Sequence, residues 1–387
     1  MRIYLDYNAT TPPAPEVIEA MADSLRDDFG NPSSVHTFGQ QAKAALDRAR
    51  TATAALIDAA GAEIVLTSGG TEADNLALRG AFEARRTSGR RRIVTTGIEH
   101  EAILKTAQAL AAQGAEVVVI PATSRGVIDP AEVASAVDAN TCLVSVMLAN
   151  NEIGTVQPVA ELAEHCRAQG ALLHTDAVQA AGKLPISVTA LGIDMLSLSA
   201  HKFAGPKGAG ALWIRRGVRL AAQSTGGRQE RNRRAGTENV PALVGMGVAA
   251  SLAKSHLDDA PAVRRLRDRL ESAILANVPG TIVNGADADR VPNTTNISFD
   301  GIEAESLLIA LDLEGVAVST GSACSSGSLE PSHVLRAMGL PNNRARNSLR
   351  FSLGTPTTEA EIDFVAGVLP GLVAKLRRLG RPMEAVR

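Results

Sequence analysis

The sequence predicts an α/β fold in which a large domain with a mostly parallel, seven-stranded sheet is followed by a smaller α+β domain. Between residues 63 and 214, short apolar runs typical of buried strands alternate with stretches typical of amphipathic helices. Strands separated by helices pair in parallel, and such a sheet is covered by helices on both faces. With 387 residues, 45% of them hydrophobic, the chain is long enough for two domains and can bury a sizeable core.

The elements of the large domain, which we place at residues 16–258, follow in order from the N-terminus. Residues 1–15 contain a short apolar piece and a turn-rich segment, and we expect them to pack with the smaller domain. Helices are expected at 16–25 and 40–59, separated by a loop at 29–38. The seven expected strands are 64–67, 92–95, 116–120, 143–148, 171–174, 195–198 and 209–214. The helices between these strands are 72–83, 101–113, 130–137 and 159–169.

Beyond residue 261 the order of elements changes, which predicts the smaller domain at 259–387. Its expected elements are helices at 263–277, 303–311, near Val334 and from Thr358, and strands at 295–299, 316–319 and 348–353. Residues 320–328 form a loop rich in glycine and serine between a strand and a helix. The glycines predict that this loop can move.

Composition and charge exclude several classes of partner. The formal net charge of −2 gives no electrostatic reason to bind nucleic acid or an anionic membrane, and 3% aromatic residues leave few side chains for stacking bases. Cys142, Cys166 and Cys324 are far apart and form no CxxC pair, which argues against a disulfide framework and fits a reducing compartment. No apolar leader and no uninterrupted apolar run of membrane-spanning length stands out, so we expect a cytoplasmic protein.

Lys202 follows the expected strand at 195–198, in the sequence LSLSAHKFAGPKGAG. The glycines and the proline after it are typical of turns. A lysine just past the end of an apolar strand lies where open α/β sheets bind their ligands. Burial there lowers the pKa of the amine and lets it form a Schiff base with an aldehyde. Taken alone, Lys202 is more simply explained as a solvated loop lysine.

Two other strand ends carry chemistry that matches this lysine. Gly69, Gly70 and Thr71 join a strand to a helix, and backbone N–H groups at a helix N-terminus attract anions such as phosphate. Asp176 ends another strand, where its carboxylate can pair with a protonated ring nitrogen. Each feature alone also fits a simpler structural role, such as a helix N-cap. Together with Lys202 they supply the groups that pyridoxal phosphate requires.

Further side chains at strand ends complete the set. His100 can stack on a cofactor ring or transfer a proton near neutral pH, although capping a helix is its simpler explanation. Gln179 lies three residues after Asp176, and Asn151 follows the strand at 143–148. Cys324 lies among serines and glycines with no apolar periodicity, which predicts an exposed thiol. Such a thiol is a nucleophile where its thiolate is favoured.

An ordered series of motifs along nearly the whole chain resembles the cysteine desulfurases, the NifS- and IscS-like branch of the class-V aminotransferases. The motifs are LDYNATTP (5–12), FGNPSSVH (29–36), TSGGTEADN (67–75), EH (99–100), NNEIGT (150–155), HTDAVQ (174–179), SLSAHKFAGPKGAG (197–210), RRAGTENV (233–240), GSACSSGSLEPSHVL (321–335) and LRFSLG (349–354). The series is very specific for this family. The resemblance implies a fold-type I pyridoxal-phosphate enzyme with cysteine desulfurase activity.

The resemblance also implies a role for each matching residue. Lys202 would hold the cofactor and act as the base, His100 would lie over the cofactor ring, and Cys324 would accept the sulfur. Arg350 and Asn151 would bind the substrate carboxylate, where a guanidinium suits bidentate pairing. The residues that would bind pyridoxal phosphate are Gly70, Thr71, Asn151, Asp176, Gln179, Ser199, His201, Lys202 and Thr237.

By the same resemblance, L-cysteine would be converted into L-alanine while its sulfur stays on Cys324 as a persulfide. That persulfide would supply sulfur for iron–sulfur cluster assembly, in a nitrogenase-related or general role, or for other thio-cofactors. It would also make Cys324 a transient cluster ligand, which is the one metal role expected here. The expected partners are a second copy of the chain, whose Thr237 would complete the phosphate site, and a sulfur acceptor or iron–sulfur scaffold protein. The C-terminal sequence RRLGRPMEAVR does not resemble the tail by which the housekeeping enzymes bind their scaffold, so the acceptor stays open.

Two other functions fit parts of the sequence. A selenocysteine lyase or an aminotransferase would keep Lys202 and Asp176, although an aminotransferase would not need Cys324. A non-catalytic scaffold subunit of the same fold should have lost Lys202 or Cys324, and both residues are present.

Overall fold

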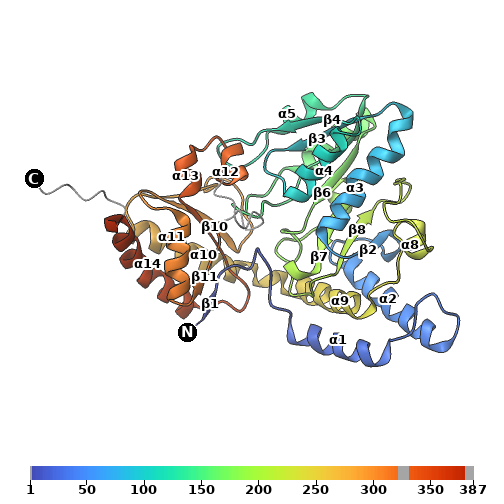
Figure 1. The fold of residues 1–387 in the computed structure, drawn as a ribbon, viewed down its shortest axis with the longest axis horizontal. Coiled ribbons are helices and arrows are strands. Elements are labelled where there is room, and N and C mark those ends of the chain that lie inside the picture. Colours follow the sequence, from blue (N-terminus) through green and yellow to red (C-terminus); the bar gives the residue numbers. More distant parts are fainter. Residues whose placement is uncertain (1, 321–330, 380–387) are drawn as a thin grey trace, which may run out of the picture.

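The computed structural model describes residues 2–320 and 331–379, and it contains the seven-stranded sheet that the sequence predicts. The strand order is β2-β8-β7-β6-β5-β3-β4, and every pairing is parallel except those of β8, which runs antiparallel to both neighbours. The strands are β2 (Ile64–Thr67), β3 (Arg92–Thr96), β4 (Glu116–Ile120), β5 (Thr141–Ser145), β6 (Leu172–Asp176), β7 (Met195–Ser199) and β8 (Gly210–Ile214). Figure 1 shows this sheet on the right of the molecule.

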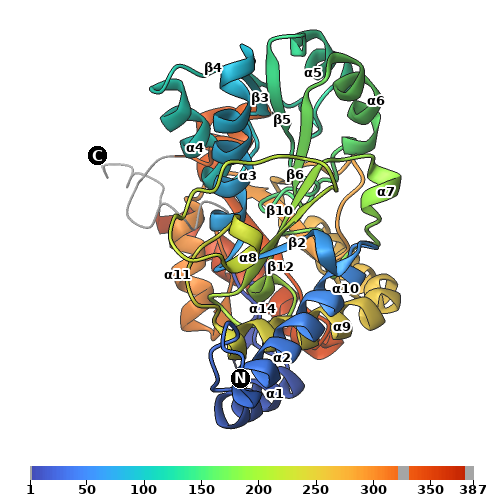
Figure 2. The same ribbon diagram turned by 90° about the vertical axis from the view of Figure 1, so that its right-hand side faces the viewer.

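Helices cover both faces of the sheet because successive strand residues point to opposite sides. Leu172 of β6 packs into the core beneath α3 and α4, whereas Leu173 belongs to the core on the other face. Figure 2 shows α3 and α4 on one side of the sheet and α5 and α6 on the other. The helices of this domain are α1 (Pro15–Asp27), α2 (Thr37–Ala55), α3 (Gly70–Arg85), α4 (Glu101–Ala111), α5 (Pro130–Ala136), α6 (Val159–Gln169), α7 (Val188–Leu191), α8 (Gln229–Asn232) and α9 (Val240–Ser255).

Helix α9 was not among the elements expected from the sequence, for a physical reason. This helix packs against α1 and α2 and touches the short 3₁₀ helix Ala200–Lys202, so apolar and small residues are needed around most of its surface. A helix that is buried on most sides lacks the alternation of apolar and polar faces that marks a surface helix. Gly247 of α9 faces Ala49 of α2 so closely that a Cβ at Gly247 would lie 2.6 Å from the Cα of Ala49.

A second hydrophobic core lies in the other part of the molecule. It combines Ile3 and Leu5 from the N-terminus with apolar residues from Val263 onward. Its strands are β1 (Ile3–Tyr4), β9 (Thr281–Val283), β10 (Thr294–Phe299), β11 (Val316–Ala317) and β12 (Ser348–Ser352). Its helices are α10 (Ala260–Asn277), α11 (Ala304–Leu313), α12 (His333–Ala337), α13 (Asn342–Arg346) and α14 (Glu359–Leu379). The domain bounds 1–15, 16–258 and 259–387 stay predictions.

The sheet of this second part is antiparallel, with the order β12-β10-β9. β1 pairs in parallel with β11, so the first residues of the chain lie beside residues more than 300 positions later. Figure 1 shows β1 next to β11 and α14. The N-terminal segment then crosses to the large sheet, where residues beyond Asp6 meet the loop that carries Lys202.

One helical stretch among the described residues, Val240–Asn277, is long and apolar enough to cross a membrane by length and composition alone. Half of its most apolar window is buried inside the structure, and α9 supplies much of that burial against α1 and α2. A core helix of a globular domain meets the same criteria, so the stretch is weak evidence for a membrane span.

The close approach of α9 to α2 predicts a stability effect. Gly247→Ala should lower the free energy of unfolding by roughly 1–3 kcal/mol, because the added methyl group meets backbone that cannot move aside. Gly367→Ala is the matched control: a Cβ at this exposed position of α14 meets nothing within 4 Å. There the same substitution should raise the free energy of unfolding by about 0.5–1 kcal/mol. Urea unfolding measures both changes, and equal effects at the two sites would contradict the packing argument.

Candidate active site

The carboxyl ends of two neighbouring strands form the framework of the site. Asp176 is the last residue of β6, and Ser199 is the last residue of β7, which lies beside β6. The 3₁₀ helix Ala200–Lys202 continues directly from β7 and carries Lys202. Because β6 and β7 are parallel, both open at the same edge of the sheet, where α/β sheets bind ligands.

Glycines bring the start of α3 against the end of β7. Gly210 pairs with both Thr67 and Ser199, and a Cβ on Gly210 would lie 2.5 Å from the Cα of Gly69. A Cβ on Gly70 would lie 3.5 Å from the Cβ of Ser199. Larger residues at these positions would push the N-terminus of α3 away from β7. The glycines therefore form a cradle of backbone N–H groups beside a hydroxyl, which is the chemistry that binds phosphate.

The N-terminal segment holds the amine of Lys202. Its Nζ donates to the carbonyl oxygens of Asn8, at 2.5 Å, and Ala9, at 2.8 Å. The carbonyl of the neighbouring His201 accepts hydrogen bonds from both the backbone N–H and the hydroxyl of Thr11, each at 2.9 Å. The position of Lys202 at the end of β7 is therefore set jointly by the sheet and by the start of the chain.

Asp176 is a buried carboxyl, with 5% of its surface exposed. Its Oδ1 accepts a hydrogen bond of 2.9 Å from the backbone N–H of Val178. Burial raises the pKa of the Asp176 carboxyl, whereas the charges of His100 and Lys202 and this hydrogen bond lower it. A cation placed against Asp176 would favour its ionised form further, and a protonated ring nitrogen is such a cation.

Two more buried carboxyls lie close to Asp176: Asp74 on α3, and Glu99 just before α4. Within the described residues, Asp74 Oδ1 and Glu99 Oε2 are buried without a hydrogen-bond partner. Burial and the charge of Asp176 raise the pKa of Asp74 well above its ordinary value. Burial, with a smaller contribution from Asp176, raises the pKa of Glu99 to about 8. These shifts favour the neutral forms of Asp74 and Glu99, whereas the charge of Lys202 favours the ionised form of Asp176.

His174 lies on the same face of β6 as Asp176, two residues earlier. Its Nδ1 is 2.9 Å from Ser145 Oγ, and its Nε2 is 3.0 Å from Ser197 Oγ. Burial lowers the pKa of this imidazole to about 3, so His174 is neutral in the folded protein. The polar layer behind Asp176 thus adds hydrogen bonds without adding charge.

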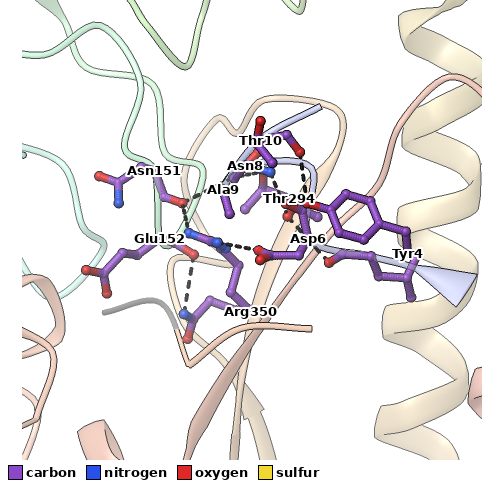
Figure 3. A network of polar contacts seen from close by, with 12 residues as sticks. Tyr4, Asp6, Asn8, Ala9, Thr10, Asn151, Glu152, Thr294 and Arg350 are labelled. Carbon is purple, nitrogen blue, oxygen red and sulfur yellow. Dashed lines mark hydrogen bonds and ion pairs between the residues drawn. The ribbon is translucent and has the colours of Figure 1, made fainter. Parts of the chain in front are cut away.

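Arg350 lies on β12 at the junction of the two parts of the molecule, and 2% of its surface is exposed. Its Nη1 donates to the backbone carbonyl of Asn151 at 3.0 Å, and its Nη2 is paired with Asp6 Oδ1 at 2.6 Å. Figure 3 shows the guanidinium between these two residues, with Asn8 beside them. A group suited to bind a carboxylate therefore belongs to the same network of contacts that holds Lys202.

Gln179 and Asn151, two of the predicted cofactor ligands, make hydrogen bonds within the chain. Gln179 donates from Nε2 to the carbonyl of Asn8 at 2.9 Å, and its Oε1 accepts from Lys183 Nζ at 2.6 Å. Asn151 contacts Arg350 through its backbone carbonyl, while its side chain points away from the guanidinium (Figure 3). These two residues line the site.

The two predicted histidines both lie at the site. His100 caps α4, and its Nδ1 accepts from the backbone N–H of Ala102 at 3.1 Å, while its charge acts on Asp176. His201 Nδ1 is 3.1 Å from the hydroxyl of Thr10. Burial and the nearby charge of Lys202 lower the pKa of His201 to about 4, so this imidazole is neutral as well.

Thr71 is exposed at the first turn of α3, next to the glycine cradle. Thr237 is also exposed, and it lines a cavity of about 240 Å³ with Thr67 and Ser68 of the same chain. Cys324 and the rest of its predicted loop from residue 321 onward lie outside the described residues.

The sequence analysis assigned no role to Asp6, Asn8 and Lys183, which the structure brings into the site. Asn8 accepts from Lys183 Nζ through Oδ1 at 3.0 Å, in addition to the contact with Lys202 described above. Burial, together with the charges of Lys202 and Arg350, holds the pKa of the Lys183 amine well below its ordinary value. A signal for Asp6 and Asn8 was present in the motif LDYNATTP, but local pattern says nothing of partners hundreds of residues away.

No group of three or more His, Cys, Asp or Glu side chains that could hold a metal ion occurs among the residues that the structure describes. Cys142 and Cys166 are buried free thiols, and burial raises the pKa of each to about 12. Neither is a thiolate at neutral pH, so neither has the reactivity expected of a catalytic cysteine.

The raised pKa of Glu99 predicts how stability depends on pH. The folded protein keeps this proton up to about pH 8, whereas the unfolded chain releases it near the ordinary value of 4.5, so raising the pH between these values favours unfolding. Glu99→Gln cannot release a proton and removes this penalty. Relative to wild type, the variant should therefore gain roughly 1–3 kcal/mol of unfolding free energy between about pH 5 and pH 8. Urea unfolding of the protein without bound small molecules measures the difference, and a constant difference would contradict the assignment.

Comparison with known proteins agrees with this geometry. Residues 3–365 match the family described as aminotransferase class-V. A cysteine desulfurase of Nostoc sp. is 51% identical over 378 residues, covering 97% of this chain and 94% of that protein. A cysteine desulfurase of Cereibacter sphaeroides is 52% identical over 380 residues, covering 98% of this chain and 97% of the other. Cysteine desulfurase IscS of Methanosarcina thermophila is 47% identical over 378 residues, with 97% and 93% covered.

Among solved structures, that of a NifS-like protein superposes with a TM-score of 0.91 at 37% sequence identity, covering 97% of this chain and all of the other. The match therefore spans both parts of the molecule and the junction that holds the site. Taken with the strand-end arrangement of Lys202, Asp176 and the glycine cradle, these likenesses show that the chain belongs to the cysteine desulfurases of the class-V aminotransferase family, whose members depend on pyridoxal phosphate.

Proposed function

We propose that this cysteine desulfurase binds pyridoxal phosphate at the edge of the sheet formed by β6 and β7, and that Cys324 receives the sulfur of free L-cysteine. The observation that carries the proposal is the placement of Lys202 and Asp176 at the ends of these neighbouring parallel strands. An amine for the aldehyde and a carboxylate for the ring nitrogen then lie at the same edge of the sheet.

The residues present fit the cofactor. Gly70 and Ser199 form a cradle that a side chain at position 70 would fill, which suits a phosphate at the start of α3. Asp176 is a buried carboxyl, and a cation placed against it, such as a protonated ring nitrogen, would favour its ionised form. When bound, pyridoxal phosphate supplies an electron-accepting ring joined to the substrate amine.

Each side chain then has a definite task. Lys202 would hold the aldehyde of the cofactor, and its amine would be the base that takes the proton from the substrate Cα. Asp176 keeps the proton on the ring nitrogen, while Arg350 orients the substrate carboxylate. His100, at the N-terminus of α4, lies where it can cover the ring and move a proton.

The sulfur transfer needs one thiolate. The thiolate of Cys324 attacks the substrate sulfur, forming a sulfur–sulfur bond as the Cβ–S bond breaks, and the electron pair of the broken bond stays with carbon. Protonation of that carbon skeleton gives L-alanine, and Cys324 carries the persulfide. One thiol and one cysteine thus give one persulfide and one alanine, without an external oxidant or reductant.

The persulfide would pass to a sulfur acceptor or an iron–sulfur scaffold protein, and a homodimer would place Thr237 at the phosphate site of its partner. The exposure of Thr237 supports the dimer, because an exposed hydroxyl can reach a second chain. The buried free thiols of Cys142 and Cys166 fit a location in the reducing cytoplasm.

Cys324→Ser tests the role of the thiol. The variant should keep the yellow colour of the bound cofactor and still bind L-cysteine, because seating the cofactor and docking the substrate use other residues. Formation of both alanine and sulfide should fall by at least about a hundredfold, since a serine hydroxyl is not ionised at neutral pH and cannot carry a persulfide. Amino-acid analysis and sulfide release measure the two products.

Cys166→Ser is the matched control, because replacing this buried thiol should lower stability at most and leave product formation unchanged. In addition, wild type treated with one equivalent of L-cysteine and no reductant should gain one sulfur atom on the peptide that contains Cys324, as mass spectrometry can detect. Turnover of cysteine to alanine by Cys324→Ser at a rate near wild type would overturn the proposed mechanism.

A further inference from the structure

The guanidinium of Arg350 is already paired with a carboxylate of its own chain. Asp6 Oδ1 lies 2.6 Å from Arg350 Nη2, and the backbone carbonyl of Asn151 accepts from Nη1. Arg350 Nε is buried and has no hydrogen-bond partner among the described residues. Figure 3 shows Asp6 and Asn151 on opposite sides of the guanidinium. Nη1 and Nη2 of the guanidinium are thus paired within the chain, whereas the buried Nε donor has no hydrogen-bond partner among the described residues.

The pairing has a clear electrostatic reason. A guanidinium with 2% of its surface exposed has lost most of its water, and a buried cation without a counter-charge is strongly destabilising. Glu152 is the other acidic side chain whose charge acts on this region, and burial raises the pKa of its carboxyl. The carboxyl in direct contact with the guanidinium is that of Asp6.

The backbone, rather than the ion pair, holds Asp6 in this place. Its neighbours Leu5 and Tyr7 donate to the carbonyls of Ala317 and Ser352, at 2.9 and 3.1 Å. The carbonyl of Asp6 itself accepts from the hydroxyl of Tyr4 at 3.1 Å. The Asp6 carboxylate is therefore presented to Arg350 by a fixed frame, and the charge can be removed without removing the frame.

A substrate carboxylate that docks on Arg350 meets a cation that is already neutralised. The incoming amino acid places a second negative charge beside Asp6, which weakens its binding relative to an unpaired arginine. The same repulsion helps the product leave, because product alanine carries the same carboxylate as substrate cysteine.

We propose that Asp6 takes the place of the substrate carboxylate at Arg350 when no amino acid is bound, and so compensates the charge of the guanidinium. When an amino acid binds, Asp6 competes with the carboxylate of the substrate or product. Asp6 is in this sense a positioning residue that sets how tightly the site holds amino acids. The inference rests on the proposed function, since it takes Arg350 as the group that receives the substrate carboxylate.

Asp6→Asn tests the inference in the cofactor-loaded enzyme. Asparagine has the same shape, and its Oδ1 can still accept from Arg350 Nη2, so the variant loses the charge and keeps the contact. Binding of L-alanine, followed by the absorption of the cofactor, should become at least about tenfold tighter, the lower end of the coupling between close charge pairs. The KM for L-cysteine should fall in parallel, with kcat equal to or below that of wild type because product leaves more slowly.

Two controls separate charge from general disturbance. Cysteamine has the amine and thiol of cysteine but no carboxylate, so Asp6→Asn should leave its binding unchanged. Tyr4→Phe removes the hydroxyl that donates to the carbonyls of Asp6 and Thr10 without changing any charge. This matched variant should bind L-alanine and cysteamine in the same ratio as wild type.

A second measurement covers the case in which Asp6→Asn is poorly folded. Acetate can bind where the substrate carboxylate would dock, and Asp6→Asn lacks the charge that repels it, so acetate should raise the thermal unfolding temperature of Asp6→Asn more than that of wild type. Weaker alanine binding in Asp6→Asn, an equal change for cysteamine, or the absence of this selective effect of acetate would overturn the role of Asp6. Failure of wild type itself to bind L-alanine or to turn over L-cysteine would instead contradict the proposed function.

Discussion

The structure of the site depends on one buried asparagine. Asn8 has 1% of its surface exposed, and each of its polar groups has a partner. Its carbonyl accepts from Lys202 and Gln179, which come from the large sheet, and its Nδ2 donates to Asn151 and to the hydroxyl of Thr294. The backbone N–H of Asn8 donates to Ser352 Oγ, on the strand that carries Arg350. The start of the chain therefore joins both parts of the molecule where the chemistry is expected.

This arrangement explains why the first residues matter as much as the strand ends. β1 pairs with β11 and holds the segment against the smaller part, after which the chain crosses to the 3₁₀ helix that carries Lys202. Lys202 and Arg350 are both fixed by residues within three positions of one another, Asp6 to Ala9. One short segment therefore contacts both the amine and the guanidinium.

The two carboxyls Asp176 and Asp6 are placed differently in the site. Behind Asp176, burial raises the pKa of Asp74 and Glu99 and favours their neutral forms. At the junction, Asp6 is paired with Arg350. This pairing keeps the buried guanidinium from standing alone, which would cost several kcal/mol. The two differ in purpose: Asp176 requires a cation from outside the chain, whereas Arg350 has its anion already.

Local sequence pattern was enough to predict the α/β class, the seven strands of the large sheet, and the placement of Lys202, Asp176 and Gly70 at strand ends. These features follow from local pattern, because apolar runs, glycines and the residue after a strand are read from neighbours in the chain. The likeness of ten ordered motifs then indicated the family, which comparison with known proteins confirmed.

Which residues share the site depends on the folded structure. Asp6 meets Arg350 across 344 residues of chain, a separation over which no local pattern operates. The contacts of Gln179 with Asn8 and Lys183 likewise join residues that no local pattern connects. α9 was not predicted because a helix that is surrounded by protein has no polar face. The neutral state of His174 and the raised pKa of Glu99 arise from burial, and burial is a property of the packed molecule rather than of the sequence read along the chain.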